Sequence, residues 1–387
     1  MNERVDRNTL ASDVRLGIVG CGNVLDLFYL ASVPQIRGLR VTAVADADGD
    51  RAQRASDQIP GSAVLELHEL LESPEVDVVL NLTTPASHHE VSLAAVRAGK
   101  HVYSEKPLAT SIDLAREILG AADAAKVRVG CAPDTVLGTG VQTARRFIDD
   151  GLLGTPTAAS ASLLLPGHEL WHPNPDFYYL PGGGPVLDMG PYYLTALFHL
   201  LGPITEVQAM SSRPQLTRTI RSGPRAGQVI PVQIDTHVSS LLRHSNGALS
   251  TLTISFDAPN TRTPFIEVHG TAGSLSIPDP DQFHGPVEIS TERRGSWTEL
   301  PVSAGYLQSR RGAGLADMLY AIDNEQPHRA NGDIAYHVLE VMTAISRSAD
   351  TGRLVTINTC PRRPPLVPLV PVPAVSGRRA QEVQREN

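Results

Sequence analysis

A lysine followed by a proline closes a strand-like run in the first third of the chain. Lys106 and Pro107 come directly after Glu105, and residues 100–104 before them read as a short strand. Because Pro107 fixes its own φ and biases the preceding residue toward an extended backbone, the Lys106 amine can be aimed in one direction. At the carboxyl edge of a nucleotide-binding sheet, such an amine would meet a reacting hydroxyl. Together with a glycine-rich turn at residues 20–23, this segment indicates a redox enzyme.

A glycine-rich turn near the N-terminus indicates the nucleotide-binding sheet. Gly20 and Gly22 follow a strand-like run and precede an expected helix over residues 24–33, so that a pyrophosphate could approach the helix N-terminus. By itself this motif fits a cofactor site and an ordinary strand–helix turn about equally. Asp46, after the expected strand 39–45, could accept both adenosine-ribose hydroxyls and would repel a 2′-phosphate. NAD is therefore favoured over NADP as the cofactor.

Strand-like and helix-like segments alternate up to residue 131, which predicts a doubly wound parallel sheet. The expected strands are 14–19, 39–45, 76–82, 101–103 and 127–131, and the expected helices are 24–33, 89–98 and 113–125. Beyond Pro156, strand-like stretches separated by turns predict a second α/β domain with a large, mostly antiparallel open sheet. Its expected strands are 157–165, 204–211, 236–242, 248–255 and 265–269, and its expected helices are 186–201, 313–324 and 334–349. The fold class is α/β.

Composition excludes several classes of protein. The 387 residues carry a net charge of −8, which argues against a nucleic-acid or anionic-membrane partner. No apolar run reaches the roughly 18 residues needed to span a bilayer, and the N-terminus lacks the apolar core of a signal peptide. The three cysteines are far apart, and the histidines show no metal-ligand spacing. We expect a cytoplasmic protein without a metal centre.

An aromatic segment at residues 165–179 is the candidate substrate loop. Aromatic rings with polar edges suit sugar rings, which offer apolar faces and hydroxyl rims. Trp171, His172 and Tyr178 are the candidate substrate contacts. A surface loop with locally packed rings would explain the same residues equally well.

Several spaced motifs together resemble the Gfo/Idh/MocA oxidoreductase family over about residues 14 to 360. They are residues 20–23, Thr84-Pro85 with His89, residues 104–107 and the glycine-rich run 182–193. The resemblance implies a Rossmann domain followed by an open-sheet α/β domain. It also implies NAD(P)-dependent oxidation or reduction of a sugar, cyclitol or related polyol, by a homodimer or homotetramer built on the exposed face of the second sheet.

The resemblance also assigns residues to roles. The implied catalytic residues are Lys106, Asp188 and Tyr192, with Tyr192 standing where the family commonly has histidine, and with Thr195 where a further family aspartate falls. The expected cofactor contacts are Gly20, Gly22, Asn23, Val24, Asp46, Thr84, Pro85, His89 and Glu105. The expected regions are a flexible N-terminus (1–13), an NAD-binding Rossmann domain (14–133), a substrate-binding and oligomerisation domain (134–360) and a proline-rich, disordered tail (361–387).

The tyrosine variant is chemically coherent if its surroundings make the phenol more acidic. A free tyrosine titrates near pH 10 (a pKa of about 10), too high for a base at neutral pH. Lys106 and a positive nicotinamide would lower the pKa of Tyr192, and the same ring would favour neutral Lys106. Asp188 and Tyr192 share a helix face only if one helix holds both residues. Pro191 could instead be the first residue of that helix. The adjacent Tyr193 is an alternative candidate for the catalytic tyrosine.

Two other functions fit this sequence, and the first of them uses the same catalytic residues. Tightly held NAD could oxidise a glycoside transiently and permit elimination of the aglycone, giving net glycosidic cleavage. A sugar or cofactor sensor of this fold would need no chemistry, and the retained Lys106, Asp188 and Tyr192 argue against it.

Overall fold

The computed structural model describes residues 13–293 and 295–376. Within these residues the N-terminal half forms a six-stranded, wholly parallel sheet in the order β3-β2-β1-β4-β5-β6. Its central strands β4 and β5 are buried on both faces, and β4 is largely apolar, as expected of a sheet covered by helices. This confirms the doubly wound Rossmann sheet. The strands are β1 Val14–Val19, β2 Leu39–Ala45, β3 Ala63–Val64, β4 Val78–Asn81, β5 His101–Ser104 and β6 Val129–Cys131.

The helices of this half agree with the prediction except after the glycine turn. There, the expected helix 24–33 is a single π-helical turn, η1 (Leu25–Tyr29), followed by a short 3₁₀ turn, η2 (Val33–Gln35). Helices α1 and α2 and strand β3 were also not predicted; α1 buries only two alanines and so has no apolar period. The remaining helices and turns are α1 Gly49–Gln58, α2 Leu67–Glu72, η3 Pro85–Ser87, α3 His88–Arg97 and α4 Ile112–Ala125.

The second sheet has nine strands in the described part of the chain, in the order β16-β15-β14-β13-β7-β12-β11-β8-β18. Every neighbouring pair is antiparallel except β7 with β12, which agrees with the expected mostly antiparallel sheet. The strands are β7 Pro156–Leu164, β8 Ile204–Ser212, β11 His237–His244, β12 Leu249–Ser255, β13 Ile266–Gly270, β14 Ser274–Ile277, β15 Glu288–Ser290, β16 Thr298–Glu299 and β18 Val355–Thr356.

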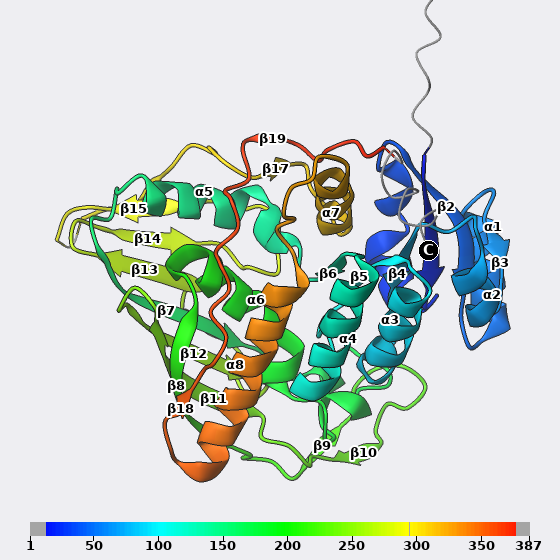
Figure 1. Ribbon diagram of the computed structural model, residues 1–387. Helices are drawn as coiled ribbons and strands as arrows, with labels where there is room; N and C mark the ends of the chain where they lie inside the picture. The colour runs from blue at the N-terminus through cyan, green and yellow to red at the C-terminus, as the bar shows by residue number, and fades with distance from the viewer. Residues whose placement is uncertain (1–12, 294, 377–387) are drawn as a thin grey trace, which may run out of the picture.

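Helices cover one face of the nine-stranded sheet, as Figure 1 shows for α5, α6 and α8. Burial alternates along β11, so one side of each strand meets this helical layer and the other is exposed. None of the helices in the described residues is long and apolar enough to cross a membrane. The helices are α5 Thr139–Asp149, α6 Pro185–Leu201, α7 Ala313–Asp323 and α8 Gly332–Thr351, and a separate hairpin pairs β9 Thr217–Thr219 with β10 Val229–Pro231.

The proline-rich tail corrects one expectation. Residues 361–376 are extended, but they are packed against the protein rather than disordered, with Val367 and Val375 buried. Their strand β19 (Val370–Pro371) pairs in parallel with β17 (Tyr306–Leu307). In Figure 1 this segment runs in red from the end of the large sheet, past α6 and α8, to the six-stranded sheet. Residues 1–12, in the expected flexible N-terminus, and residues 377–387, at the end of the expected disordered tail, lie outside the described part.

Candidate active site

The glycine turn after β1 leaves room for a phosphate group. Gly20 has φ +97°, and a Cβ there would lie 2.6 Å from the backbone of Leu82 and Thr83, so only glycine fits. At Gly22, by contrast, an added Cβ would meet only the Arg51 Nη1 atom, at 4.0 Å. This open space at the start of η1 fits the pyrophosphate of a dinucleotide. The predicted contacts Asn23 and Val24 follow directly, exposed and half-buried respectively.

Asp46 lies beside this turn at the end of β2. Its Oδ2 accepts a hydrogen bond from the backbone N–H of Cys21 at 2.6 Å, and its Oδ1 accepts one from the N–H of Asp48 at 2.8 Å. These two bonds fix the carboxylate at the expected position of the adenosine ribose. Thr84 and Pro85 are exposed at the carboxyl end of the neighbouring strand β4.

His89 does not join this group. It lies in the first turn of α3, and its Nε2 is 2.9 Å from Glu117 Oε2 on α4. The preceding residue, His88, is the one directed toward the site, with Nδ1 2.6 Å from the carbonyl oxygen of Pro107 and Nε2 3.0 Å from that of Thr83. His88 thereby braces the turn that carries Lys106.

Glu105 connects the lysine turn to the glycine turn. Tyr29, the last residue of η1, donates its hydroxyl to Glu105 Oε1 at 2.7 Å. The other oxygen of Glu105 accepts the backbone N–H of Lys106 at 3.0 Å. Since Glu105 and Tyr29 are both buried, this bond ties the two loops at the expected cofactor edge.

Lys106 and Asp188 form an ion pair at the centre of the site. The Lys106 Nζ donates to the Asp188 carbonyl oxygen at 2.7 Å and to its Oδ1 at 3.0 Å, while His168 Nε2 lies 3.1 Å from the other carboxylate oxygen. Burial alone would raise the pKa of Asp188, but Lys106 and His168 lower it to about 2. Burial alone would lower the pKa of Lys106, yet Asp188, Tyr192 and Glu105 raise it above its usual value. In the protein without a bound cofactor Lys106 is therefore charged, whereas the expected neutral form depends on a positive nicotinamide.

Tyr192 faces the same lysine. Helix α6 begins at Pro185 and runs through Pro191, so it holds Asp188 and Tyr192 one turn apart, and Lys106 Nζ lies 5.2 Å from the Tyr192 ring centroid. The hydroxyl of the competing Tyr193 instead donates to Asp279 at 3.2 Å.

The phenol is less acidic than expected. Burial raises the pKa of Tyr192 above its usual value, and this outweighs the lowering by Lys106 and Arg311. In the protein alone, Lys106 lowers this pKa as expected but burial outweighs it, and the rest of the expected lowering depends on a positive nicotinamide. Arg311, which the sequence analysis missed, donates from Nη2 to the Tyr192 hydroxyl at 3.2 Å.

The aromatic segment contributes a residue that the prediction did not name. The buried ring of His168 packs against that of Tyr178, with centroids 3.9 Å apart. Of the predicted contacts, Tyr178 is half-buried, and burial, with a further contribution from Asp188, raises its pKa to about 12. Trp171 is 61% exposed, and its ring contacts both His168 and His172. Tyr178 and His168 thus lie at the site, while Trp171 and His172 lie further out in the same ring cluster.

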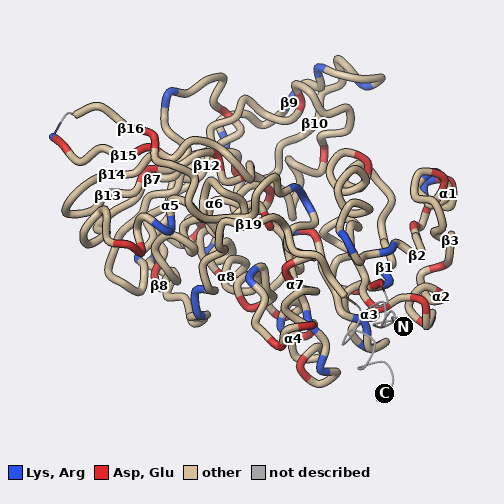
Figure 2. The backbone as a smooth tube through the Cα atoms, turned by 90° about the horizontal axis from the view of Figure 1, so that it is seen from above, with Lys and Arg blue, Asp and Glu red and all other residues tan. Residues whose placement is uncertain are grey.

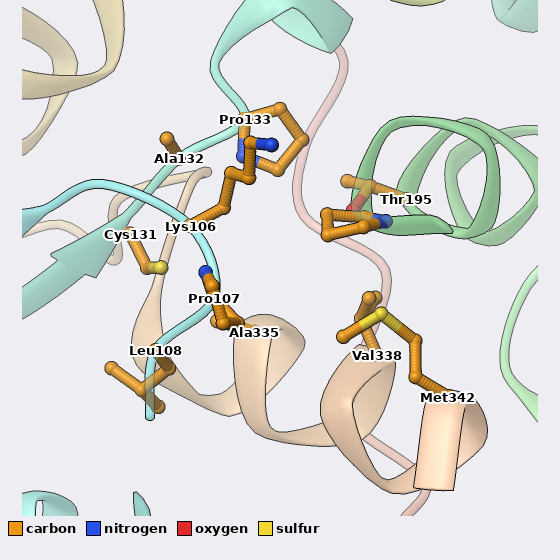
Figure 3. A pocket seen from close by; sticks show the side chains of 11 residues that line it. Lys106, Pro107, Leu108, Cys131, Ala132, Pro133, Thr195, Ala335, Val338 and Met342 are labelled. Atoms are coloured by element: carbon orange, nitrogen blue, oxygen red, sulfur yellow. The ribbon is translucent and has the colours of Figure 1, made fainter. Parts of the chain in front are cut away.

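A cavity of about 10 Å³, room for about one water molecule, lies behind Lys106. In Figure 3 the lysine turn and residues 131–133 line one side of it, and α6 and α8 line the other. Thr195, at the position of the further family aspartate, lines this cavity. Thr195 therefore lies across this cavity from Lys106, and none of the described hydrogen bonds joins it to Asp188.

Known proteins match the chain over most of its length. Two family models match it, described as "Oxidoreductase family, NAD-binding Rossmann fold" (residues 14–132) and "GFO/IDH/MocA C-terminal domain" (residues 141–276). A 1,5-anhydro-D-fructose reductase from Ensifer adhaerens is 28% identical over 89% of this chain and 99% of its own. A D-glucoside 3-dehydrogenase from Escherichia coli is 26% identical over 90% and 98%. A levoglucosan dehydrogenase solved with NADH and levoglucosan superposes with a TM-score of 0.76 at 20% identity, over 90% of this chain and all of its own. The chain belongs to the Gfo/Idh/MocA family of oxidoreductases.

Proposed function

We propose that the protein transfers a hydride between NAD(H) and a hydroxyl or keto carbon of a sugar, glycoside or cyclitol. The observation that carries this proposal is the meeting of Lys106, Asp188 and Tyr192, which come from the β5 edge and from α6. The names of the relatives support the substrate class, since they are reductases and dehydrogenases of sugars and glucosides.

Each residue has a separate task in this reaction. A bound nicotinamide supplies or accepts the hydride. Lys106, kept charged by Asp188, donates a hydrogen bond to the substrate oxygen and stabilises negative charge that develops there. Tyr192 is protonated at neutral pH because its pKa is raised, so the resting enzyme is prepared to donate a proton during reduction of a ketone. In oxidation the same phenol must first lose its proton.

NAD is the preferred cofactor in this proposal. The carboxylate of Asp46 lies where the ribose hydroxyls of the adenosine are expected, and it would repel a 2′-phosphate there. Arg51 of α1 is paired with Asp48, with Nε 3.3 Å from Oδ2. This pairing weakens Arg51 as a partner for a phosphate.

The working unit is a homodimer or homotetramer in this proposal. The face of the nine-stranded sheet away from the helices carries Met210, Leu241 and Leu249, which are 79%, 57% and 48% exposed. Covering such an apolar sheet face with a second copy would remove it from water. In the view of Figure 2, acidic and basic residues are interspersed around both halves of the molecule.

The test is a screen of sugars, glycosides and cyclitols with NAD, followed through the absorbance of NADH. We expect NADH to accumulate in step with product, and Lys106→Ala and Tyr192→Phe to lower kcat by roughly 100-fold or more. Tyr193→Phe is the matched control, because its hydroxyl contacts Asp279 instead of the lysine. Aglycone release without net NADH would favour glycoside cleavage, and NAD binding without turnover on any polyol would favour a sensor.

A further inference from the structure

We propose that Arg311 is a positioning residue, which holds the Tyr192 hydroxyl so that its proton faces the substrate and which stabilises the phenolate when that proton leaves. This inference rests on the proposed function, in which Tyr192 moves the proton. Arg311 comes from the loop between β17 and α7, far in sequence from the family motifs. It therefore adds a third segment of the chain to the site.

The guanidinium is held in one place by several contacts. Its Nη2 donates to Asp281 Oδ1 at 2.6 Å and to the Tyr192 oxygen at 3.2 Å. Its central carbon lies 5.1 Å from the Tyr192 ring centroid and 5.9 Å from those of Phe28 and Phe283. Only 11% of the side chain is exposed. A buried cation with this many neighbours has little freedom to turn away from the phenol.

The direction of the hydrogen bond decides where the phenolic proton points. A guanidinium can only donate, so the Tyr192 oxygen accepts from Arg311 and its own proton lies elsewhere. Among residues 13–293 and 295–376, no acceptor takes that proton. Tyr193 and Tyr306 differ, because their hydroxyls donate to Asp279 and Asp317. Tyr192 alone of these three therefore keeps a proton available for a substrate oxygen.

The charges around Tyr192 show what Arg311 contributes. Lys106 and Arg311 lower the pKa of the phenol, whereas burial, Glu105 and Asp281 raise it. Since Lys106 is engaged by Asp188, Arg311 is the cation that touches the phenol oxygen itself. Without Arg311, burial and the carboxylates of Glu105 and Asp281 would disfavour the phenolate, and Lys106 would be the remaining one of these two cations to favour it.

The backbone at Arg311 has hydrogen bonds of its own, one of them to Asp134, whose other carboxylate oxygen lies 3.8 Å from the Arg311 guanidinium. Its carbonyl oxygen accepts the Ser32 hydroxyl at 2.6 Å, and the next N–H, that of Gly312, donates to Asp134 Oδ2 at 2.8 Å. We therefore expect Arg311→Met, which keeps most of the packed side-chain length, to fold. Arg311→Lys, which keeps the charge, is the second variant.

The experiment is a pH profile of kcat for oxidation of the polyol identified in the screen, with NAD. Oxidation needs the phenolate, so kcat rises as pH rises through the pKa of Tyr192. Arg311→Met should move this rise to higher pH and lower kcat at neutral pH by roughly 10- to 100-fold, the effect of a hydrogen bond to a charged group. Arg311→Lys should recover part of the loss. The Kd for NAD, measured by calorimetry, should change by less than about 3-fold, because Arg311 acts on the proton rather than on binding.

Arg329 provides the matched control, since it also contacts a tyrosine, Tyr306, at 3.3 Å and pairs with an aspartate, Asp317. Arg329→Met should lower stability and leave the pH profile in place. In a Tyr192→Phe background, Arg311→Met should cost little further activity. An equal cost in both backgrounds, or an unchanged pH profile in Arg311→Met, would overturn the inference. If Tyr192→Phe itself is fully active, the proposed role of Tyr192 fails first and this inference fails with it.

Discussion

At the scale of single residues, Asp46 gives the most direct test of cofactor choice. Its carboxylate is fixed by the N–H groups of Cys21 and Asp48, so a 2′-phosphate would meet a fixed negative charge. We expect Asp46→Ser to lower the ratio of the Kd for NADP to the Kd for NAD by roughly 10-fold, the effect of 1.4 kcal/mol. Calorimetric titration with both cofactors measures this ratio. Asp57→Ser, whose carboxylate lies toward the other end of α1 and accepts a hydrogen bond from Gln53, is the control and should leave the ratio unchanged. Tighter binding of NADP by the wild type would contradict the assignment.

Residue assignments could be predicted where a motif fixes the local backbone and not where the fold brings distant segments together. Lys106, Asp188 and Tyr192 follow from their motifs, and the structure brings them together. His88 and His89 are adjacent, and only the helix start decides which ring turns toward Pro107. No spacing in the sequence joins Arg311 to Tyr192, because that contact depends on the loop before α7.

At the scale of elements, the β9–β10 hairpin fixes the aromatic segment over the site. Arg218 of β9 pairs with Glu169 at 3.0 Å and also with Asp257, and all three side chains are largely buried. Glu169 follows His168 directly, and it accepts the hydroxyl of Tyr179, whose oxygen in turn accepts the His168 N–H at 3.0 Å. The hairpin thus controls the position of a ring that contacts Asp188.

Replacing this buried arginine should weaken substrate binding more than chemistry. We expect Arg218→Met to raise KM by roughly 10-fold with a smaller change in kcat, because the aromatic segment would bind the ground state and the transition state alike. Unfolding by denaturant should show a loss of about 3–5 kcal/mol, since two carboxylates lose their buried partner. Arg146→Met, which breaks the exposed pair with Asp150 at the end of α5, is the control and should change KM little. A fall in kcat at constant KM would show that the hairpin acts on the chemical step.

The type of an element was predictable where its buried residues recur with a regular period, and not where too few residues are buried to show one. The longer strands of both sheets read correctly because their apolar runs or alternations reflect burial, whereas the short strands β3, β14, β15, β16 and β18 were not predicted. Helix α1 was missed because its sequence, GDRAQRASDQ, buries only Ala52 and Ala55. The turn after Gly22 winds as a π-helix over Leu25–Tyr29, and the same stretch places Tyr29 against Glu105. That contact between distant loops has no signal in the local sequence.

At the scale of the whole molecule, the tail joins the two sheets. Arg363 donates to the carbonyl oxygens of His199 and Leu200 at the end of α6, at 3.2 and 3.1 Å. Further along, Val367 donates its N–H to Gln142 at 2.9 Å, and Val375 donates its N–H to the carbonyl of Arg37, next to β2, at 2.9 Å. Prolines alone predict an extended surface segment, and the valines between them give no sign of which surface buries them.

Removing this tail should destabilise the protein as a whole. Ending the chain after residue 360 removes two buried valines and the cap on α6, and we expect Tm to fall by roughly 5 °C or more. Ending it after residue 376 keeps every described contact of the tail and serves as the control. Scanning calorimetry of both chains measures the two Tm values. A single transition at lower temperature would mean that the whole protein loses stability, whereas two separate transitions would mean that the two halves unfold independently. Because none of the hydrogen bonds of residues 361–376 is made to Lys106 or Tyr192, kcat at a temperature well below Tm should stay within about 2-fold of the full chain. An unchanged Tm after removal of residues 361–387 would mean that the tail lies on a surface already stable without it.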